Sequence, residues 1–176
     1  RRQRQMCIRD SARGDTVTFV SMTSGAQTHN ERLHDELMKP EAERDPDVFN
    51  QDDRAYAEQK AREIRQVCAL FGVEDVRLLN LPDKPFRKTP EAVSLLRDII
   101  YEVRPHVLIT QSPFRSGRHG MADGAHDDHL DTAFTVKEAQ MLASLPNYET
   151  QERPHTIAAT YYPGVYFMAV SYTHLR

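Results

Sequence analysis

The chain has 176 residues and a mass of 20.3 kDa, enough for one domain with a hydrophobic core but not comfortably for two. Hydrophobic residues make up 39% of it and charged residues 28%, a composition typical of a soluble globular protein. The formal net charge of −3 gives no reason to expect nucleic acid or an anionic membrane as partner, and no apolar run is long enough to span a bilayer.

Two cysteines, Cys7 and Cys68, make no disulfide framework, and the first residues contain no signal-peptide core. Both features suit a reducing compartment, so we expect a cytoplasmic protein. Residues 1–10 and 171–176 lack periodicity and are expected to be non-native tails, which leaves 11–170 as a single domain. The alternative for the first tail is a basic arm that binds a partner, but four arginines without an aromatic or apolar face specify little.

In chain order, residues 16–21 are short, β-branched and nearly continuous in apolar character, which predicts a strand covered on both faces. Thr23-Ser24-Gly25 then forms a turn at the carboxyl end of this strand, where open α/β sheets bind ligands. Residues 29–52 are polar and acidic, and we interpret them as a long loop that serves as a substrate lid or is disordered.

Residues 53–71 carry apolar side chains at steps of three and four and are followed by Gly72, so they predict a helix in which Cys68 is a small core residue. Residues 76–79 predict the next strand, and Leu81-Pro82-Asp83 predicts a turn at its carboxyl end. Thr89-Pro90-Glu91 opens a second helix, with a threonine cap and proline at the first position, and Pro105 ends it. Its expected apolar face is Val93, Leu96, Ile99, Ile100 and Val103.

Residues 107–110 predict a third strand and residues 156–161 a last one. Between them, a loop rich in Gly, Arg and His leads to the sequence from His126 to Asp131, which packs two histidines and three acids into six positions. A helix starting near Asp128 would leave His126 on the loop and put His129 on the first turn. The expected face of this helix is Leu130, Phe134, Val136, Lys137 and Met141. Imidazole is the commonest metal ligand near neutral pH. An isolated His-x-x-His beside an acidic helix cap would more often be two exposed histidines, but the flanking loop favours a site here.

Strands and helices that alternate in this way predict a doubly wound, mostly parallel α/β sheet of Rossmann-like type. The loops after Ser21, Leu79 and Thr110 all follow strand carboxyl ends, so we expect them to converge on one rim with His129.

The chain resembles the PIG-L/LmbE-like family of zinc-dependent N-acetylglucosaminyl deacetylases over most of 11–170, in order and spacing. The most specific part of the resemblance is His126-Asp127-Asp128-His129. The other parts are Thr23-Ser24-Gly25, Leu70-Phe71-Gly72-Val73, Leu81-Pro82-Asp83 and the passage from Arg104-Pro105 into Val107-Leu108-Ile109-Thr110.

The resemblance implies a role for each matching residue. His129 would be a ligand to Zn²⁺ or another divalent metal, His126 would act on the developing oxyanion or leaving amine, and Asp128 would orient His126. Asp83 and Lys60 would bind substrate, a small N-acetylated amino-sugar conjugate from which an acetyl group is removed by amide hydrolysis.

The sequence departs from the family pattern in three places. The family's other two zinc ligands and its catalytic base lie in a His-Pro-Asp-Asp segment after a first strand, and nothing before Ser11 supplies it. Ala26 stands where an acid is usual, and Lys60 where an arginine is usual. We therefore expect a sheet without its first strand, and a 176-residue chain that binds zinc weakly, lacks deacetylase activity and is marginally stable or aggregation-prone.

Two other functions compete with a deacetylase. Metal phosphohydrolases of the HD type also use His-Asp pairs, but they are all-helical, and three β-branched strands argue against them. A non-catalytic sugar-binding or structural domain of the same fold is the main alternative. The particular sugar and the oligomeric state are not determined by the sequence.

Overall fold

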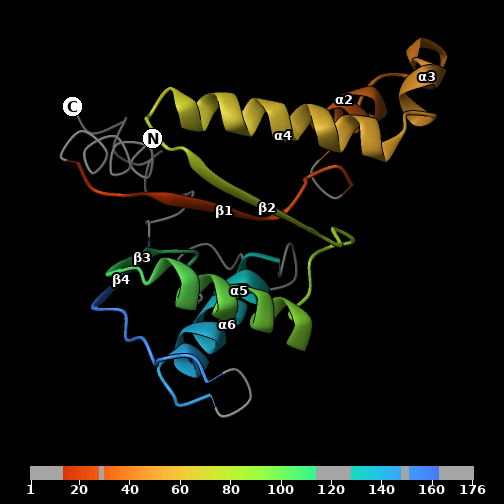
Figure 1. Cartoon of the computed structure of the whole chain (residues 1–176). Coiled ribbons are helices and arrows are strands. Elements are labelled where there is room, and N and C mark those ends of the chain that lie inside the picture. The colour runs from red at the N-terminus through yellow and green to blue at the C-terminus, as the bar shows by residue number, and fades with distance from the viewer. Residues whose placement is uncertain (1–13, 28–29, 114–127, 148–150, 163–176) are drawn as a thin grey trace, which may run out of the picture. The chain divides into compact units, whose positions relative to one another are not determined.

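The computed structural model describes residues 14–27, 30–113, 128–147 and 151–162, and it divides into two compact units, Arg1–Pro85 and Phe86–Arg176. Each unit contains one pair of parallel strands together with helices (Figure 1), so the predicted α/β class with parallel strands is confirmed. No helix within these described ranges is long and apolar enough to cross a membrane. The elements are β1 (Thr18–Thr23), α2 (Glu31–Leu37), η1 (Glu41–Glu43), α3 (Pro46–Phe49), α4 (Asp53–Ala69), β2 (Asp75–Leu81), α5 (Pro90–Val103), β3 (Val107–Ile109), α6 (Asp128–Ala143) and β4 (Ala159–Tyr161).

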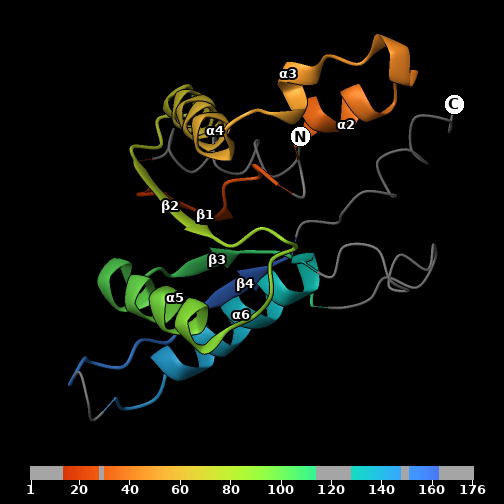
Figure 2. The same ribbon diagram turned by 90° about the vertical axis from the view of Figure 1, so that its right-hand side faces the viewer.

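In the first unit, β1 pairs in parallel with β2, and α4 lies along one face of the pair (Figures 1 and 2). The predicted strand is displaced by two residues, and it is only half-buried, because Phe19 keeps 38% of its surface exposed. The register shifts after Ser21, and Asn80 of β2 has a φ of 49°. This irregularity is a β-bulge near the end of β2, just before the turn at Pro82 and Asp83.

The long helix α4 begins after Asp52, whose side chain accepts a hydrogen bond from the backbone N–H of Arg54. It ends at Ala69, and the chain turns away at Gly72, where a φ of 69° favours glycine. Cys68 is buried, as predicted for a core residue. The predicted helix over 53–71 is confirmed to within the usual uncertainty of helix ends.

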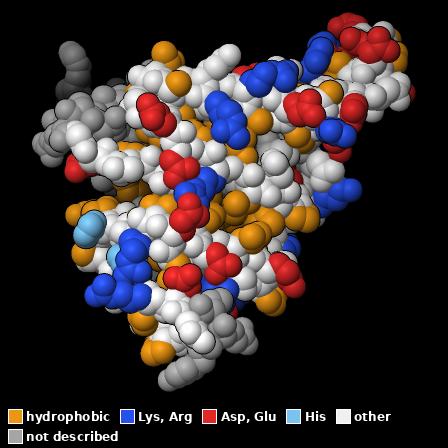
Figure 3. Space-filling view, in the orientation of Figure 1, with side chains coloured by type: hydrophobic (Ala, Val, Ile, Leu, Met, Phe, Trp, Pro, Cys, Tyr) orange, Lys and Arg blue, Asp and Glu red, His pale blue; other side chains and the backbone are white. Residues whose placement is uncertain are grey.

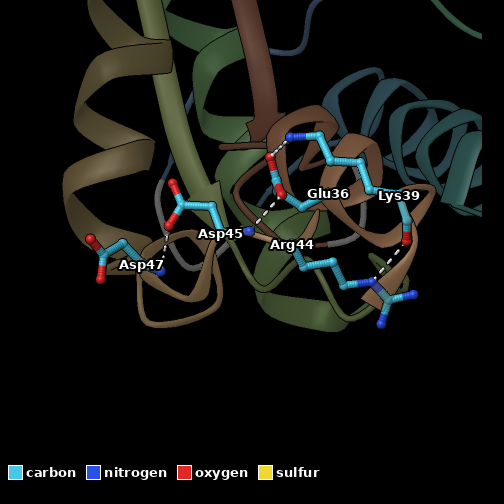
Figure 4. Close-up of polar contacts among 5 residues, drawn as sticks. All are labelled: Glu36, Lys39, Arg44, Asp45 and Asp47. Atoms are coloured by element: carbon cyan, nitrogen blue, oxygen red, sulfur yellow. Dashed lines mark hydrogen bonds and ion pairs between the residues drawn. The ribbon is translucent and has the colours of Figure 1, made fainter. Parts of the chain in front are cut away.

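Residues 30–50 do not form the long loop that the sequence suggested. They contain α2, η1 and α3, with Asn30 and Asp45 as side-chain caps. The buried carboxylate of Glu36 joins these short elements, because it accepts hydrogen bonds from Lys39 and from the backbone N–H of Asp45 (Figure 4). Acidic and basic side chains are interspersed over this segment (Figure 3). The short elements are stabilised by these side-chain contacts, and they lack the apolar periodicity by which longer helices are recognised in a sequence.

In the second unit, α5 follows the sequence prediction closely. The hydroxyl of Thr89 accepts a hydrogen bond from the N–H of Ala92 at 3.2 Å, and Pro90 occupies the first turn. Val93, Leu96 and Ile100 are buried. The helix ends at Arg104, which adopts a left-handed conformation with a φ of 50° and donates hydrogen bonds to the carbonyls of Arg153 and Pro154.

Helix α6 packs beside α5 and runs in the same direction (Figures 1 and 2). The start of α5 is joined to the start of α6 by Arg87 and Asp131, and the ends are joined by the hydroxyl of Tyr101 and the carbonyl of Leu142. Of the mixed face expected for α6, Val136 is buried, whereas Phe134 and Met141 are about half exposed. The buried residues of α6 are Asp128, Ala133, Thr135, Val136, Ala139 and Ala143.

The strands β3 and β4 complete a parallel β-α-β unit around α6, with Val107 opposite Ala159 and Ile109 opposite Tyr161. Both strands are shorter than predicted. His155 fixes the chain before β4, because its backbone N–H donates to the carbonyl of Ala143 at 2.8 Å and its ring lies 2.8 Å from the carbonyl of Pro105.

Candidate active site

The loops that follow β1 and β2 meet at one edge of the first unit. The backbone N–H of Gln27 donates to Oδ2 of Asp83 at 3.4 Å, and Asp83 exposes only 4% of its surface. Ala26, which stands where the family usually has an acid, is buried at 3% exposure. Because both strands are parallel, their carboxyl ends lie at the same edge. The predicted convergence of these two loops is therefore confirmed, whereas the part of the prediction that concerns Thr110 and His129 stays a prediction.

Two further hydrogen bonds fix this edge. The side-chain amide of Asn30 donates to the carbonyl of Ala26 at 3.2 Å, and the amide of Gln27 donates to Asp53 at 2.9 Å. The first bond joins the turn after β1 to α2, and the second joins it to the start of α4. The turn after β1 is thus hydrogen-bonded to the turn after β2, to the cap of α2 and to the start of α4.

Lys60, a predicted substrate-binding residue, lies on α4 with its side chain one-quarter exposed. Its ammonium is 3.6 Å from Glu31 and 3.4 Å from Glu63, and it lies 5.4 Å from the centre of the Tyr56 ring. Burial alone would lower the pKa of Lys60, but the Tyr56 phenol and the Glu63 carboxylate outweigh it and raise that pKa. Lys60 therefore carries a positive charge at neutral pH.

The second unit contains the start of the predicted histidine motif. Helix α6 begins at Asp128, as the sequence predicted, with Asp128 buried and His129 half-buried on the first turn. Oδ2 of Asp131, in the same turn, accepts a hydrogen bond from Nη1 of Arg87 at 3.1 Å. His126 lies outside the described residues. The roles assigned to Asp128 and His129 stay predictions.

Zinc in a catalytic site usually takes three protein ligands from His, Cys, Asp and Glu. Within the described ranges, no group of three or more such side chains is placed to hold a metal ion. An imidazole at His129 with a carboxylate beside it suits one position of such a site. The described side chains do not complete such a site.

The structure also shows residues that sequence reasoning missed. Arg87 and Lys88 reach from the start of α5 to Asp131 and Glu138 of α6, and Tyr56 lies beneath Lys60. Basic residues before a helix cap carry no signal of their own, because their partners are 44 and 50 residues away in sequence. Tyr56 could have been noticed, since it precedes Lys60 by one helical turn.

Comparison of the sequence with known protein families identifies the family of this chain. The sequence profile described as "PIG-L: GlcNAc-PI de-N-acetylase" matches residues 5–140, which is more than half of the chain. The chain belongs to the PIG-L family. The profile includes α6 as far as Gln140 and therefore both histidines of the motif.

A curated relative extends this result. The 1D-myo-inositol 2-acetamido-2-deoxy-alpha-D-glucopyranoside deacetylase of Streptomyces griseus is 29% identical over 175 residues, covering 89% of this chain and 49% of the relative. The chain thus spans about half the length of the curated relative that it matches.

Solved structures of the same fold have different activities. The 4-carboxy-2-hydroxymuconate hydratase GalB of Pseudomonas putida matches with a TM-score of 0.69 and 16% identity, over 90% of this chain and 57% of GalB. The N,N'-diacetylchitobiose deacetylase of Pyrococcus horikoshii matches with a TM-score of 0.65 and 20% identity, over 87% of this chain and 51% of that enzyme. At such low identity these matches establish the fold alone, and the hydratase is a reminder that one fold supports different chemistries.

Proposed function

We propose that the protein is an N-deacetylase that hydrolyses the acetamide of a small N-acetylglucosamine-type conjugate. The observation that carries the proposal is the family match over residues 5–140, which includes the histidine motif at the start of α6. The Streptomyces griseus relative is named for deacetylation of an acetamido sugar joined to inositol, and this supports the same substrate class.

We further propose that the reaction depends on a divalent metal, with zinc as the first candidate and His129 as one ligand. When bound, such an ion supplies a water of lowered pKa and polarises the amide carbonyl. The carboxylate of Asp128 is buried beside His129 in sequence, at the place where the family resemblance puts the residue that orients His126. Further ligands would come from outside the described residues.

We propose that the substrate meets the edge formed by the loops after β1 and β2. Asp83 is fixed there by the backbone of Gln27, and a buried carboxylate of this kind suits recognition of sugar hydroxyls. Lys60 adds a positive charge on α4. Because Glu31 and Glu63 already neutralise much of this charge, Lys60 suits a neutral sugar conjugate better than a highly anionic one.

The alternative is a sugar-binding domain without catalysis. It is favoured by one observation, namely that Ala26 stands where the family usually has an acid. Both functions predict sugar binding, but only the deacetylase predicts release of acetate.

Acetate release from a glucosaminyl-inositol acetamide and from N,N'-diacetylchitobiose tests the proposal. The assay is run on the full protein with added zinc and with a chelator, and calorimetry measures binding of the same compounds. Zinc-dependent acetate release that is lost in His129→Ala supports the deacetylase. Saturable sugar binding without acetate release supports the binding domain, and neither binding nor release contradicts both.

A further inference from the structure

The segment just before α5 is tied to α6 by two ion pairs, one at the first turn of α6 and one two turns further on. Nη1 of Arg87 lies 3.1 Å from Oδ2 of Asp131, and Nζ of Lys88 lies 2.7 Å from Oε2 of Glu138. The two acids are seven residues apart and therefore lie on the same side of α6, two turns from each other. Phe86, which precedes this basic pair, is 3% exposed and anchors the segment.

The pair made by Arg87 acts on the turn that carries the histidine motif. Asp131 follows His129 by two residues, so helical geometry turns its side chain about 200° away from the imidazole. The hydroxyl of the fully buried Thr135 also donates to the backbone carbonyl of Asp131 at 2.5 Å. Asp131 is thus held through both its side chain and its backbone, on the side of the turn away from His129.

The free energy that such an ion pair contributes determines which part of the structure it can stabilise. Arg87 is 57% exposed, and an exposed ion pair contributes only about 0–1 kcal/mol to global stability. The first turn of a helix, however, has backbone N–H groups without intrahelical partners and is the part that frays most easily. Fraying of this one turn involves much less free energy than unfolding of the whole protein. An ion pair of this size can therefore shift the equilibrium between the ordered and the frayed turn, although it contributes little to global stability.

We propose that Arg87 is a positioning residue, whose ion pair with Asp131 fixes the first turn of α6 and so the direction of the His129 imidazole. This inference rests on the proposed function of His129. Displacement of a catalytic group by about 1 Å can reduce turnover by about 100-fold, so even partial fraying of this turn would be measurable.

The test compares Arg87→Ala with Lys88→Ala in the full protein. Lys88 is the matched control because it makes the same kind of ion pair from the adjacent position, but its partner Glu138 lies nine residues after His129. Arg87→Lys keeps the charge but loses the guanidinium geometry. We measure kcat and KM for acetate release, the thermal unfolding midpoint, and the side-chain NMR signal of His129 in protein without added metal.

For Arg87→Ala we expect kcat to fall about tenfold with little change in KM, together with a broadened or shifted His129 signal. Arg87→Lys should recover part of both, and Lys88→Ala should leave both unchanged, although the two alanine variants should unfold at similar temperatures. Equal effects of Arg87→Ala and Lys88→Ala, or an unchanged His129 signal in Arg87→Ala, would overturn the inference. If the unsubstituted protein releases no acetate, the proposed function fails, while the His129 signal still decides whether Arg87 positions this turn.

Discussion

The carboxylate of Asp83 accepts a hydrogen bond from the backbone N–H of Gln27 across 56 residues of sequence. This contact joins the turn after β1 to the turn after β2. It holds two short sequences together, Ser24-Gly25-Ala26-Gln27 and Pro82-Asp83, at the edge where parallel sheets bind ligands. The acid therefore has a structural role whether or not it also contacts a sugar.

Substitution of Asp83 separates these two roles. Asp83→Ala removes the acceptor of a part-buried N–H, so we expect it to lower the free energy of unfolding by about 1 kcal/mol. Asp83→Asn keeps an oxygen acceptor and should lose less stability, while raising KM if the carboxylate binds substrate. Urea denaturation and steady-state kinetics measure the two effects. Asp53→Asn is the control, because Asp53 bonds the exposed side chain of the same Gln27. Equal stability losses in Asp83→Ala and Asp53→Asn would contradict the structural role.

Helix α5 shows how much of the fold the sequence could predict. Its cap, its proline and its apolar spacing all lie within a few residues of each other, so local rules are enough to place it. Helix α4 was also predictable from local features, namely its apolar spacing and the glycine that follows it. The strands were found by their β-branched runs, but their ends moved by up to three residues, because pairing with a distant strand decides where a strand ends.

The elements that the sequence missed depend on distant or non-periodic contacts. The fold of residues 30–50 depends on Glu36, whose partner Asp45 is nine residues away and whose contacts are polar. In α6, the alanines at 133, 139 and 143 pack inward, while the larger Phe134 and Met141 face outward. Hydrophobicity alone predicts the opposite, because it does not account for the close approach of α5, which favours small side chains.

The buried face of α5 offers a direct check of the fold. Leu96 is 6% exposed and its neighbour Leu95 is 44% exposed, although the two residues are chemically identical. We expect Leu96→Ala to lower the free energy of unfolding by about 2–5 kcal/mol, because it removes buried methyl groups and leaves a cavity. Leu95→Ala should cost less than about 1 kcal/mol. Equal losses, measured by urea denaturation, would show that α5 is rotated from the orientation described.

Acid is expected to loosen residues 30–50 through Glu36. The backbone N–H of Asp45, and then Lys39, hold the pKa of Glu36 below its ordinary value. Because the folded pKa is lower than the unfolded one, this stabilisation is complete above the unfolded value of about 4.3 and is lost as the pH falls through the folded pKa. The amide NMR signals of Leu33 and Val48 should therefore change as the pH falls below about 4.3.

Glu36→Gln provides the test of this assignment. The variant should show the loosened signals already at neutral pH and lose most of the acid dependence. Glu41→Gln is the control, because Glu41 is exposed on η1 in the same segment. If the two variants behave alike, the acid dependence of this segment has another origin.

The two histidines of the motif should respond differently to substitution. His129 lies on the first turn of α6, where the helix fixes its backbone, whereas His126 precedes that helix and lies outside the described residues. We expect His129→Ala in the full protein to abolish zinc binding, because a ligand is lost. His126→Ala should keep the metal and lose most of the turnover, since the loss of an acid that stabilises the oxyanion typically costs about 100-fold or more in kcat. Zinc content after dialysis and acetate release at saturating zinc measure the two properties separately.

Lys88→Ala serves as the control for both, because Lys88 pairs with Glu138 away from the motif. Equal loss of zinc from both histidine variants would show that both residues are ligands, and full zinc retention by His129→Ala would remove His129 from the metal site.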